Sequence, residues 1–437
     1  MGEKQMRIKR LTTTMPDFMA QLDALLAWES VSDAEVSGRV REILQAVRER
    51  GDAAVVEYTN RFDRMSSASM SELEITQAQM NAALGRIDER QRQALEFAVE
   101  RLRIYHEHQK MSSWSYTEAD GTMLGQQISP LDRVGLYVPG GKAAYPSTAI
   151  MTAVPARIAG VRETVVVSPA GDDGAIHPAL AAACSVLDVD EVWAVGGAQA
   201  IGALAHGAGD LRRVQKIVGP GNAWVTAAKL AVYGVCAIDL PAGPSEVLVM
   251  ADATADPTIV AADLLCQAEH GPDSPALLVT DDPSLPDRVE NAIDRLLPRL
   301  GRGPILEQAL RDHGMAIVVD HHESMAEVAS AYAGEHVTVL TADPVADAAR
   351  VGAAGSIYVG RWSPESAGDY ATGANHVLPT GGLGAACGPL SVEDFGSWTQ
   401  VQYLDESGLA TLLPTITTLS GAEGLDAHGL AAAIRFD

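Results

Sequence analysis

The sequence predicts an α/β protein with two Rossmann-like, doubly wound lobes, N-terminal helices and a small helical C-terminal tail. Three observations support this prediction. From Val134 onward, short β-branched runs end in Gly, Pro, Asp or Ser and are followed by alanine-rich helical segments, as in the βαβ units of a parallel sheet. These runs occur in two sets with similar spacing. The length of 437 residues also suits several domains, since a domain takes about 150 residues.

The first ~130 residues are predicted to form amphipathic helices that pack on another part of the chain. In the segments VSGRVREILQAVRER and DERQRQALEFAVERLRIYHEHQ, apolar residues recur every three or four positions, and Gly51-Asp52 ends the first of these helices. After Gly382 we expect no further strands. The segments SVEDFGSWTQVQYL and LATLLPTITTLSGAEGLDAHGLAAAIRF predict the helical tail.

These patterns divide the chain into four expected parts. Residues 1–31 form an N-terminal helical arm, and residues 391–437 form the C-terminal helical tail. Residues 32–135 together with 240–390 form the first Rossmann-like lobe, and residues 136–239 form the second.

The two strand sets also suggest an internal repeat. The first set ends in VVVSPAG, EVWAVGGAQ, KIVGPGN and CAIDLPAGPSE, and the second in ALLVTDD, AIVVDHH, HVTVLTADP and SIYVGRWSPES. Each segment of the second set follows its counterpart by about 110 to 125 residues. A duplication of one α/β unit explains this spacing, and so does the rhythm that any two doubly wound domains share, so both explanations stay open.

The composition excludes several functions. With 57 acidic and 32 basic residues the formal net charge is −25, so no overall basic face is available for phosphates and we expect no nucleic-acid partner. No run approaches the roughly 18 to 20 apolar residues of a membrane helix, and the start MGEKQMRIKRL has no apolar signal core. We therefore expect a cytoplasmic protein with no membrane partner. The four cysteines form no CxxC pair, which suits a reducing compartment.

Three glycine clusters lie between a predicted strand and a predicted helix. They are Val138-Pro139-Gly140-Gly141, Val195-Gly196-Gly197-Ala198-Gln199 and Val218-Gly219-Pro220-Gly221-Asn222. Backbone N–H groups at such turns can bind a pyrophosphate. None completes G-x-G-x-x-G, because Trp224 fills the sixth position counted from Gly219. Each alone fits an ordinary glycine turn, but three in succession favour a nucleotide or substrate cleft at the carboxyl ends of these strands.

Gln267 and His270 end a predicted helix that begins after Asp256-Pro257. Because they are three residues apart, they project from the same helical face. Such a pair offers a metal ion one oxygen and one nitrogen. A Gln and a His at a helix C-terminus are also common cap and dipole partners, so the spacing alone does not decide.

Further polar residues that could carry chemistry follow toward the C-terminus. Glu335-His336 directly precede a predicted strand, and Asp369 and His376 lie in the glycine-rich segment after the last one. Neighbouring carboxylates and imidazoles make natural general bases, because their pKa values can be tuned toward neutrality. Taken singly, these segments also fit a surface Glu–His pair and a turn Asp. The tail residues Glu423 and His428 fit solvated helix positions.

A thiol enzyme is a further possibility. Cys266 directly precedes Gln267, and Cys387 lies in a predicted loop, so a nucleophile of the aldehyde-dehydrogenase type has to be considered. The sequence places no activating cationic group near either cysteine. The two remaining cysteines are Cys184 and Cys236.

Taken together, seven segments resemble those of the histidinol dehydrogenase family, whose members catalyse the last step of histidine biosynthesis. They are VGLYVPGG, VGGAQAI, VGPGN, AGPSEVLV, DLLCQAEHGPDS, WSPESAGDYATGANHVLPT and AEGLDAH. The resemblance runs in order from about Val31 to the C-terminus, and its motifs are long and specific. The sequence departs from the family pattern at Ala374 within GANH and at Ser397-Trp398. Many relatives carry a basic pair at the second place, so we expect this departure to alter a surface or subunit contact.

The resemblance implies a zinc-assisted, NAD-dependent oxidoreductase that converts L-histidinol through L-histidinal to L-histidine with two NAD per turnover. It implies one zinc ion per subunit, held by Gln267, His270, Asp369 and His428. It assigns the general acid–base pair to Glu335 and His336 and NAD binding to Tyr137, Gln199 and Asn222. The substrate-binding positions are Ser245, Gln267, His270, His336, Asp369, His376, Glu423 and His428. Residues 136–239 would then be the NAD-binding lobe, and the other lobe would carry the metal and acid–base residues.

The resemblance also implies an intertwined homodimer with shared active sites, in which the C-terminal tail brings Glu423 and His428 to the second subunit. One alternative is a relative that oxidises another small polar alcohol, such as sulfopropanediol. Glu423 together with His428 favours histidinol, because these residues suit a cationic amine and the metal. A catalytically silent NAD-binding or scaffold protein is the other alternative, which the complete metal and acid–base set disfavours.

Overall fold

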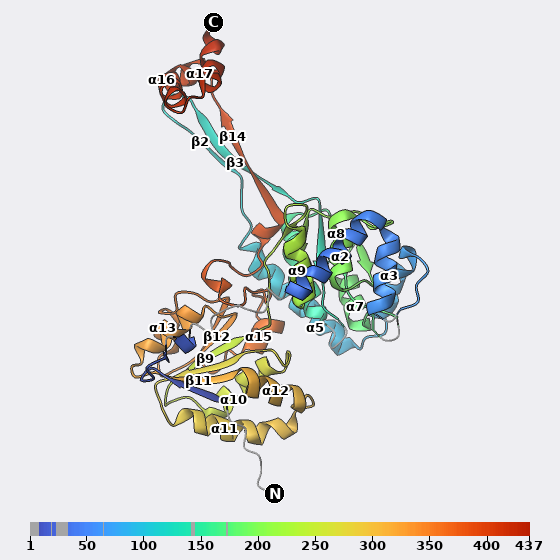
Figure 1. The fold of residues 1–437 in the computed structure, drawn as a ribbon, viewed down its shortest axis with the longest axis vertical. Coiled ribbons are helices and arrows are strands. Elements are labelled where there is room, and N and C mark those ends of the chain that lie inside the picture. Colours follow the sequence, from blue (N-terminus) through green and yellow to red (C-terminus); the bar gives the residue numbers. More distant parts are fainter. Residues whose placement is uncertain (1–7, 19, 23–33, 64, 141–144, 172–173) are drawn as a thin grey trace.

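The computed structural model describes residues 8–18, 20–22, 34–63, 65–140, 145–171 and 174–437. Strands in this part of the chain form a six-stranded sheet, a five-stranded sheet and a three-stranded sheet. The first two are parallel and lie in two lobes, whereas the third projects from them as a long arm (Figure 1). Parallel sheets covered by helices confirm the predicted α/β class. No helix among the described residues is long and apolar enough to cross a bilayer.

The smaller lobe contains the five-stranded sheet, with strand order β6-β5-β4-β7-β8. Its strands are β4 (Arg133–Tyr137), β5 (Glu163–Val167), β6 (Glu191–Trp193), β7 (Lys216–Val218) and β8 (Ala237–Ile238). The helices that follow the first four strands are α6 (Pro146–Ala159), α7 (Pro178–Val186), α8 (Gly197–His206) and α9 (Ala223–Val232). All five residues of β4 are buried, because α6 and α7 cover one face of the sheet and α8 and α9 the other.

The N-terminal helices also belong to this smaller lobe. They are α2 (Ala34–Arg50), α3 (Asp52–Phe62), α4 (Gln77–Leu84) and α5 (Glu89–Glu107), with a short 3₁₀ turn η1 (Met70–Leu73) between them. The apolar stripe of α2 packs against α8 and α9, while α4 contacts α7 and α5 contacts α6. This differs from the expected partition, which joined residues 32–135 to residues 240–390. An amphipathic stripe predicts burial but does not specify which sheet receives it.

The larger lobe contains the six-stranded sheet, with strand order β1-β11-β10-β9-β12-β13. Its strands are β1 (Lys9–Thr12), β9 (Val247–Ala251), β10 (Ala276–Thr280), β11 (Gly314–Val318), β12 (His336–Leu340) and β13 (Ser356–Val359). Its helices are α10 (Pro257–Ala268), α11 (Leu285–Leu296), α12 (Gly303–His313), α13 (Glu323–Tyr332), α14 (Pro344–Ala348) and α15 (Glu365–Tyr370), with η2 at Leu297–Arg299. Residues 9–12 of the expected helical arm thus form an edge strand, and residues 1–7, 19 and 23–31 lie outside the described residues.

The two parallel sheets share one strand order. Counting from β4 in the smaller lobe and from β9 in the larger one, the first strand is central, the second and third lie on one side, and the fourth and fifth on the other. Strand β1 is an addition at the edge of the larger sheet. The shared order agrees with duplication of one unit, but unrelated doubly wound domains also adopt it, so duplication stays a prediction.

The arm is an antiparallel ribbon that carries the C-terminal helices at its far end (Figure 1). Its strands β2 (Trp114–Thr117), β3 (Met123–Pro130) and β14 (Gly396–Tyr403) pair in the order β14-β3-β2. It ends in α16 (Glu406–Ala422), α17 (Asp426–Ala433) and η5 (Ile434–Phe436), and the segment before it forms η3 (Leu383–Ala385) and η4 (Val392–Phe395). The tail is helical as predicted, but the expectation that no strand follows Gly382 is wrong, because β14 pairs with β3 over eight residues.

Candidate active site

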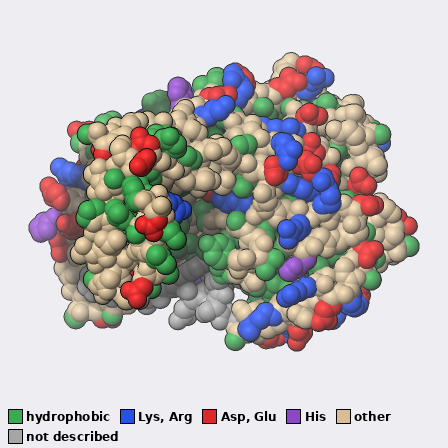
Figure 2. Space-filling view, turned by 90° about the horizontal axis from the view of Figure 1, so that it is seen from above, with side chains coloured by type: hydrophobic (Ala, Val, Ile, Leu, Met, Phe, Trp, Pro, Cys, Tyr) green, Lys and Arg blue, Asp and Glu red, His purple; other side chains and the backbone are tan. Residues whose placement is uncertain are grey.

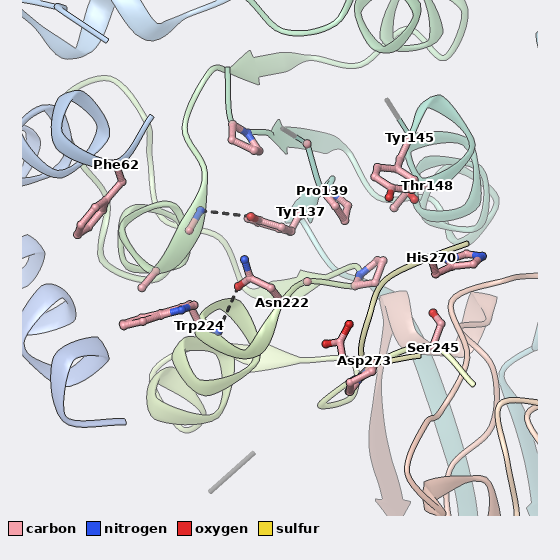
Figure 3. Close-up of a pocket in the computed structure, with 18 of the residues that line it drawn as sticks. Phe62, Tyr137, Pro139, Tyr145, Thr148, Asn222, Trp224, Ser245, His270 and Asp273 are labelled. Atoms are coloured by element: carbon pink, nitrogen blue, oxygen red, sulfur yellow. Dashed lines mark hydrogen bonds between the residues drawn. The ribbon is translucent and has the colours of Figure 1, made fainter. Parts of the chain in front are cut away.

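A cavity of about 1220 Å³ lies between the two lobes. The smaller lobe lines it with the segments that follow β4, β5, β6 and β7, so the expected cleft at the carboxyl ends of these strands is present. The larger lobe lines it with residues that precede β9, β10 and β12, at the amino edge of its sheet. Phe62 and Trp224 lie toward one end of the cavity and Ser245 and His270 toward the other, with Asn222 between them (Figure 3).

The three residues expected to bind NAD line the smaller-lobe part of this cavity. Tyr137 ends β4, and its hydroxyl oxygen accepts a hydrogen bond from the Gly197 N–H at 3.2 Å. Burial raises the pKa of Tyr137 to about 12, so the hydroxyl stays neutral. The buried Gln199 amide nitrogen has no hydrogen-bond partner among the described residues, and the Asn222 side-chain oxygen caps α9. Gly141 of the first glycine cluster lies outside the described residues.

Gly219 fixes the loop that carries Asn222. Its φ is +114°, and a Cβ atom at this position would overlap the Tyr137 carbonyl oxygen, so the loop requires glycine. The Gly219 N–H donates to the Asp239 carboxylate at 2.7 Å, and its carbonyl accepts from the Lys229 ammonium group at 2.9 Å. Lys229 and Asp239 also form a buried ion pair with each other. The two side chains therefore fix both the N–H and the carbonyl group of Gly219.

Glu335 directly precedes β12 and His336 begins it, and both are buried at the cavity wall. One Glu335 oxygen accepts from the Glu246 N–H at 3.0 Å, and the other lies 3.7 Å from Nε2 of His336. Burial and the charges of Glu246 and Asp369 raise the pKa of Glu335 well above its usual value. Burial and two nearby imidazoles lower the pKa of His336 to about 3. A neutral imidazole in this position can accept a proton.

A cluster of donors suitable for a metal lies beside this pair. One ligand atom each from His270, Glu365 and Asp369 lies within 4.8 Å of the others. Gln267 is fully buried at the end of α10, and neither atom of its amide has a hydrogen-bond partner within the described part of the chain. A buried amide without partners is costly, and a cation would satisfy its oxygen. Amide, carboxylate and imidazole donors together fit a divalent cation such as zinc.

Sequence reasoning missed Glu365. It begins α15 and lies one helical turn before Asp369, so the two carboxylates share a face of this short helix. The spacing of the two acids within WSPESAGDY is the signal that could have found it.

Two expected substrate-binding residues also reach the cavity. Ser245 precedes β9 and lines the cavity, and its hydroxyl lies near enough to Glu335 to lower the pKa of that carboxyl. The Nδ1–H of His376 donates to the backbone carbonyl of Asp369 at 3.1 Å. Burial and the nearby His270 lower the pKa of His376 to about 4, so its ring is neutral.

Comparison with known proteins decides the family. A sequence model described as "Histidinol dehydrogenase" matches residues 27–436. The chain belongs to the histidinol dehydrogenase family. It is 49% identical over 430 residues to the histidinol dehydrogenase of Dechloromonas aromatica (strain RCB), covering 98% of this chain and 99% of that relative. It is 48% identical over 428 residues to the histidinol dehydrogenase of Pseudomonas putida (strain KT2440), covering 98% and 97%.

A solved structure agrees with this assignment. The crystal structure of histidinol dehydrogenase from Elizabethkingia anophelis matches the fold with a TM-score of 0.90 at 31% sequence identity, and the match covers 98% of each chain. The resemblance seen in the sequence is therefore confirmed. As a member of the histidinol dehydrogenase family, the chain is an oxidoreductase of histidine biosynthesis.

Two residues that the histidinol dehydrogenase resemblance assigns to the site lie far from this cavity. Glu423 and His428 are exposed and belong to the helical end of the arm (Figure 1). The structure of one chain therefore gathers Gln267, His270 and Asp369 of the expected zinc ligands without His428. Whether a second subunit receives the tail stays a prediction.

The cysteines do not form an alternative centre. Burial, together with the charges of Glu365 and Asp369, raises the pKa of Cys266, which disfavours the reactive thiolate. Cys387 is exposed in the loop that precedes the arm.

Proposed function

We propose that the protein oxidises L-histidinol through L-histidinal to L-histidine, with zinc and NAD as cofactors and two NAD consumed per turnover. One observation carries the proposal, namely that one cavity joins the glycine loops of the smaller lobe, the acid–base pair and the metal-suited cluster. A dehydrogenase of this kind needs the three parts together, because the hydride acceptor, the proton acceptor and the group that positions the alcohol act on neighbouring atoms. The four free cysteines suit the reducing cytoplasm, where we place the protein.

Gln267, His270 and Asp369 would hold one zinc ion per subunit, and His428 from a second copy of the chain would add a further imidazole. A zinc ion held there would supply Lewis-acid binding and positioning of the nitrogen-bearing substrate. Tyr137, Gln199 and Asn222 would contact NAD.

The two residues of the acid–base pair serve different steps: His336 accepts a proton in the first oxidation, and Glu335 accepts one in the second. His336 is neutral because of its lowered pKa, so its Nε2 can take the proton of the alcohol as the carbon gives up its hydride. Glu335, in its ionised form, would then take a proton from the water that adds to the aldehyde. Ser245, His376 and Glu423 would orient the substrate.

We further propose an intertwined homodimer with shared active sites. The ribbon of the arm is uncovered in one chain, since seven of the eight residues of β14 are exposed. Large apolar side chains are also exposed along the arm, at Trp114, Tyr116, Trp398, Tyr403, Leu419, Leu430 and Ile434. Figure 2, which views the molecule from the side of the arm, shows hydrophobic and acidic side chains interspersed on this face. A small ribbon without a covered face is rarely stable alone, so a second copy is the natural partner.

The proposed function is tested by measuring NADH formation with L-histidinol and with sulfopropanediol, before and after exhaustive chelation. We expect two NADH per histidine formed, no turnover of sulfopropanediol, and loss of activity on chelation that added zinc restores. The sulfopropanediol alternative is not favoured, because the close relatives are histidinol dehydrogenases. If the protein oxidised sulfopropanediol but not L-histidinol, the proposed substrate would be wrong. Activity that survives chelation but is lost on cysteine alkylation would overturn the zinc assignment.

A further inference from the structure

A short loop, residues 371–376, joins the end of α15 in the larger lobe to the smaller lobe. Asp369 lies just before this loop, and His376 ends it at the cavity wall. Beyond the loop, Val377 and Leu390 are buried in the core of the smaller lobe with α6 and α7. The position of His376 therefore depends on how the loop is held between the two lobes.

Helix α5 of the smaller lobe contacts the middle of the loop. The guanidinium group of Arg101 donates to the Thr372 carbonyl at 3.0 Å and to the Ala371 carbonyl at 3.4 Å. Gly373 has a φ of +102°, and a Cβ atom at this position would overlap the Arg101 carbonyl oxygen. The loop therefore passes directly over the backbone of α5.

The side chain of Asn375 anchors the end of the loop and is buried. Its Nδ2 donates to the Met151 carbonyl of α6 at 2.7 Å, and its Oδ1 accepts from the Val377 N–H at 2.9 Å. These two backbone partners fix which way the amide points, because a carbonyl can only accept and an N–H can only donate. Nδ2 also lies 3.3 Å from Nε2 of His106.

His106 lies in the last turn of α5 and is fully buried, and its partners admit one tautomer. Its Nδ1 lies 2.6 Å from Oε1 of Gln109, which can only accept, so Nδ1 carries the hydrogen. The same Oε1 accepts from the Val392 N–H at 3.3 Å, which fixes the orientation of the Gln109 amide. The lone pair of Nε2 is then free to accept from Asn375. Burial lowers the pKa of His106, so the neutral ring that this bond requires is favoured.

We propose that His106 and Asn375 are positioning residues, which hold the loop 371–376 on the smaller lobe and thereby place His376 at the substrate. Neither residue is among the described residues that line the cavity, so both act through the loop. The inference rests on the proposed function in taking His376 as a group that orients the substrate. Because the smaller lobe also carries the residues expected to bind NAD, this contact fixes a substrate-side group relative to the cofactor side.

Four full-length variants test the proposal. His106→Leu and Asn375→Leu remove the hydrogen bond between the two side chains, whereas His106→Gln keeps an acceptor that can reach Asn375. Thr164→Val is the matched control, because Thr164 is fully buried in the smaller lobe and its hydroxyl donates to Asp190 at 2.9 Å. Neither Thr164 nor Asp190 is among the described residues that line the cavity.

Three kinds of measurement are made on each variant and on wild type. Melting temperature and zinc content show whether the variant is folded and holds metal. Steady-state kinetics give kcat and KM for L-histidinol and KM for NAD. Hydrogen exchange, followed by mass spectrometry without substrate or NAD, reports on the segment 371–376.

Both leucine variants should lower kcat/KM for L-histidinol by about 10- to 100-fold and change KM for NAD by less than about 2-fold, because a displaced positioning group affects the substrate that it orients. The segment 371–376, in which the Ala371 and Thr372 N–H groups bond to the Ala367 carbonyl, should exchange faster than in wild type. His106→Gln should recover most of the activity and of the protection from exchange. Thr164→Val should match wild type in both, even where its melting temperature falls.

Wild-type kcat/KM and wild-type exchange of this segment in the leucine variants would overturn the proposal. Equal losses for L-histidinol and NAD, with faster exchange throughout the smaller lobe, would also overturn it, since the pair would then only support the fold. If His106→Gln loses as much as His106→Leu, the hydrogen bond to Asn375 does not hold the loop and the proposal is wrong.

A failure of the proposed function gives a different result. If wild type forms no NADH from L-histidinol, the proposed substrate is wrong. The exchange of residues 371–376, which is measured without any ligand, then still decides whether His106 and Asn375 hold the loop.

Discussion

The imidazole of His336 lies between a tyrosine on one side and two carboxylates on the other. Its Nδ1 is 3.0 Å from the Tyr358 hydroxyl, and its Nε2 is 3.7 Å from Glu335 and 3.9 Å from Glu365. If Nδ1–H donates to the Tyr358 oxygen, the lone pair on Nε2 faces the cavity. We predict that the tyrosine on β13 holds this tautomer, in which Nε2 can act as a base.

Tyr358→Phe should lower kcat for L-histidinol by about 10-fold with KM changed less than about 2-fold, because the base loses its tautomer partner while the ring packing remains. Steady-state kinetics measure both values. Tyr105→Phe, on the exposed side of α5, is the control and should behave as wild type. Wild-type kcat in Tyr358→Phe would show that the hydroxyl does not orient the base.

Glu335→Gln should separate the two halves of the reaction. An amide cannot remove a proton from water, so oxidation of L-histidinal should fall by about 100-fold or more, whereas oxidation of L-histidinol to the aldehyde should fall by less than about 10-fold. Single-turnover measurements started from each compound give the two rates. Equal losses with both starting compounds would contradict this division of labour.

The prediction of the two parallel sheets succeeded for a physical reason. Strands covered by helices on both faces are continuous apolar runs, such as Ala276–Thr280, where all five residues are buried. The ribbon of the arm lacks this signal, because β14 mixes polar residues with Trp398, Val401 and Tyr403, and none of its eight residues is buried in one chain. Its pairing with β3 joins segments more than 260 residues apart, which local patterns do not reveal.

The site residues likewise divide into those that local sequence patterns predict and those that depend on how distant segments meet in the fold. Gln267 and His270 are neighbours in the sequence, so their shared helical face could be predicted. The approach of Asp369 to His270 depends on how α15 returns across the amino edge of the larger sheet, and only the resemblance to relatives supplied it. Glu365 went unnoticed because two acids one turn apart usually mark a solvated helix face.

A histidine outside the cavity should give the larger lobe a pH-dependent stability. His322 bridges two carboxylates, with Nδ1 2.9 Å from Asp281 and Nε2 2.9 Å from Asp347. The hydrogen bond to Asp281, followed by that to Asp347, raises the pKa of His322. A raised pKa in the folded state gives stability that is fully present below the unfolded value of about 6.5 and is lost as the pH rises through the folded value.

His322→Gln should therefore lower the melting temperature by about 2 °C at pH 6 and by less at pH 9. Calorimetry at both pH values measures the difference from wild type. His313→Gln, an exposed residue at the end of α12, is the control. An equal difference from wild type at pH 6 and pH 9 would show that the charge of His322 does not contribute.

The last prediction concerns the shared active site. One variant chain carries Glu335→Gln with His336→Ala, and the other carries His428→Ala, so each homodimer should be inactive. In a mixed dimer whose tails are exchanged, one site collects both sets of changes and the other is intact. Co-expressed chains with two different affinity tags, purified as the mixed dimer, should then show about half of the wild-type activity per dimer.

The opposite arrangement gives a different result. If each tail served its own subunit, one site of the mixed dimer would lack the acid–base pair and the other would lack His428, so neither would turn over. Native mass spectrometry establishes that the mixed dimer has formed, and a dimer of two differently tagged His428→Ala chains is the inactive control. A mixed dimer that forms but remains inactive would therefore show that Glu423 and His428 fold back onto their own chain, against the exposed position they have at the end of the arm.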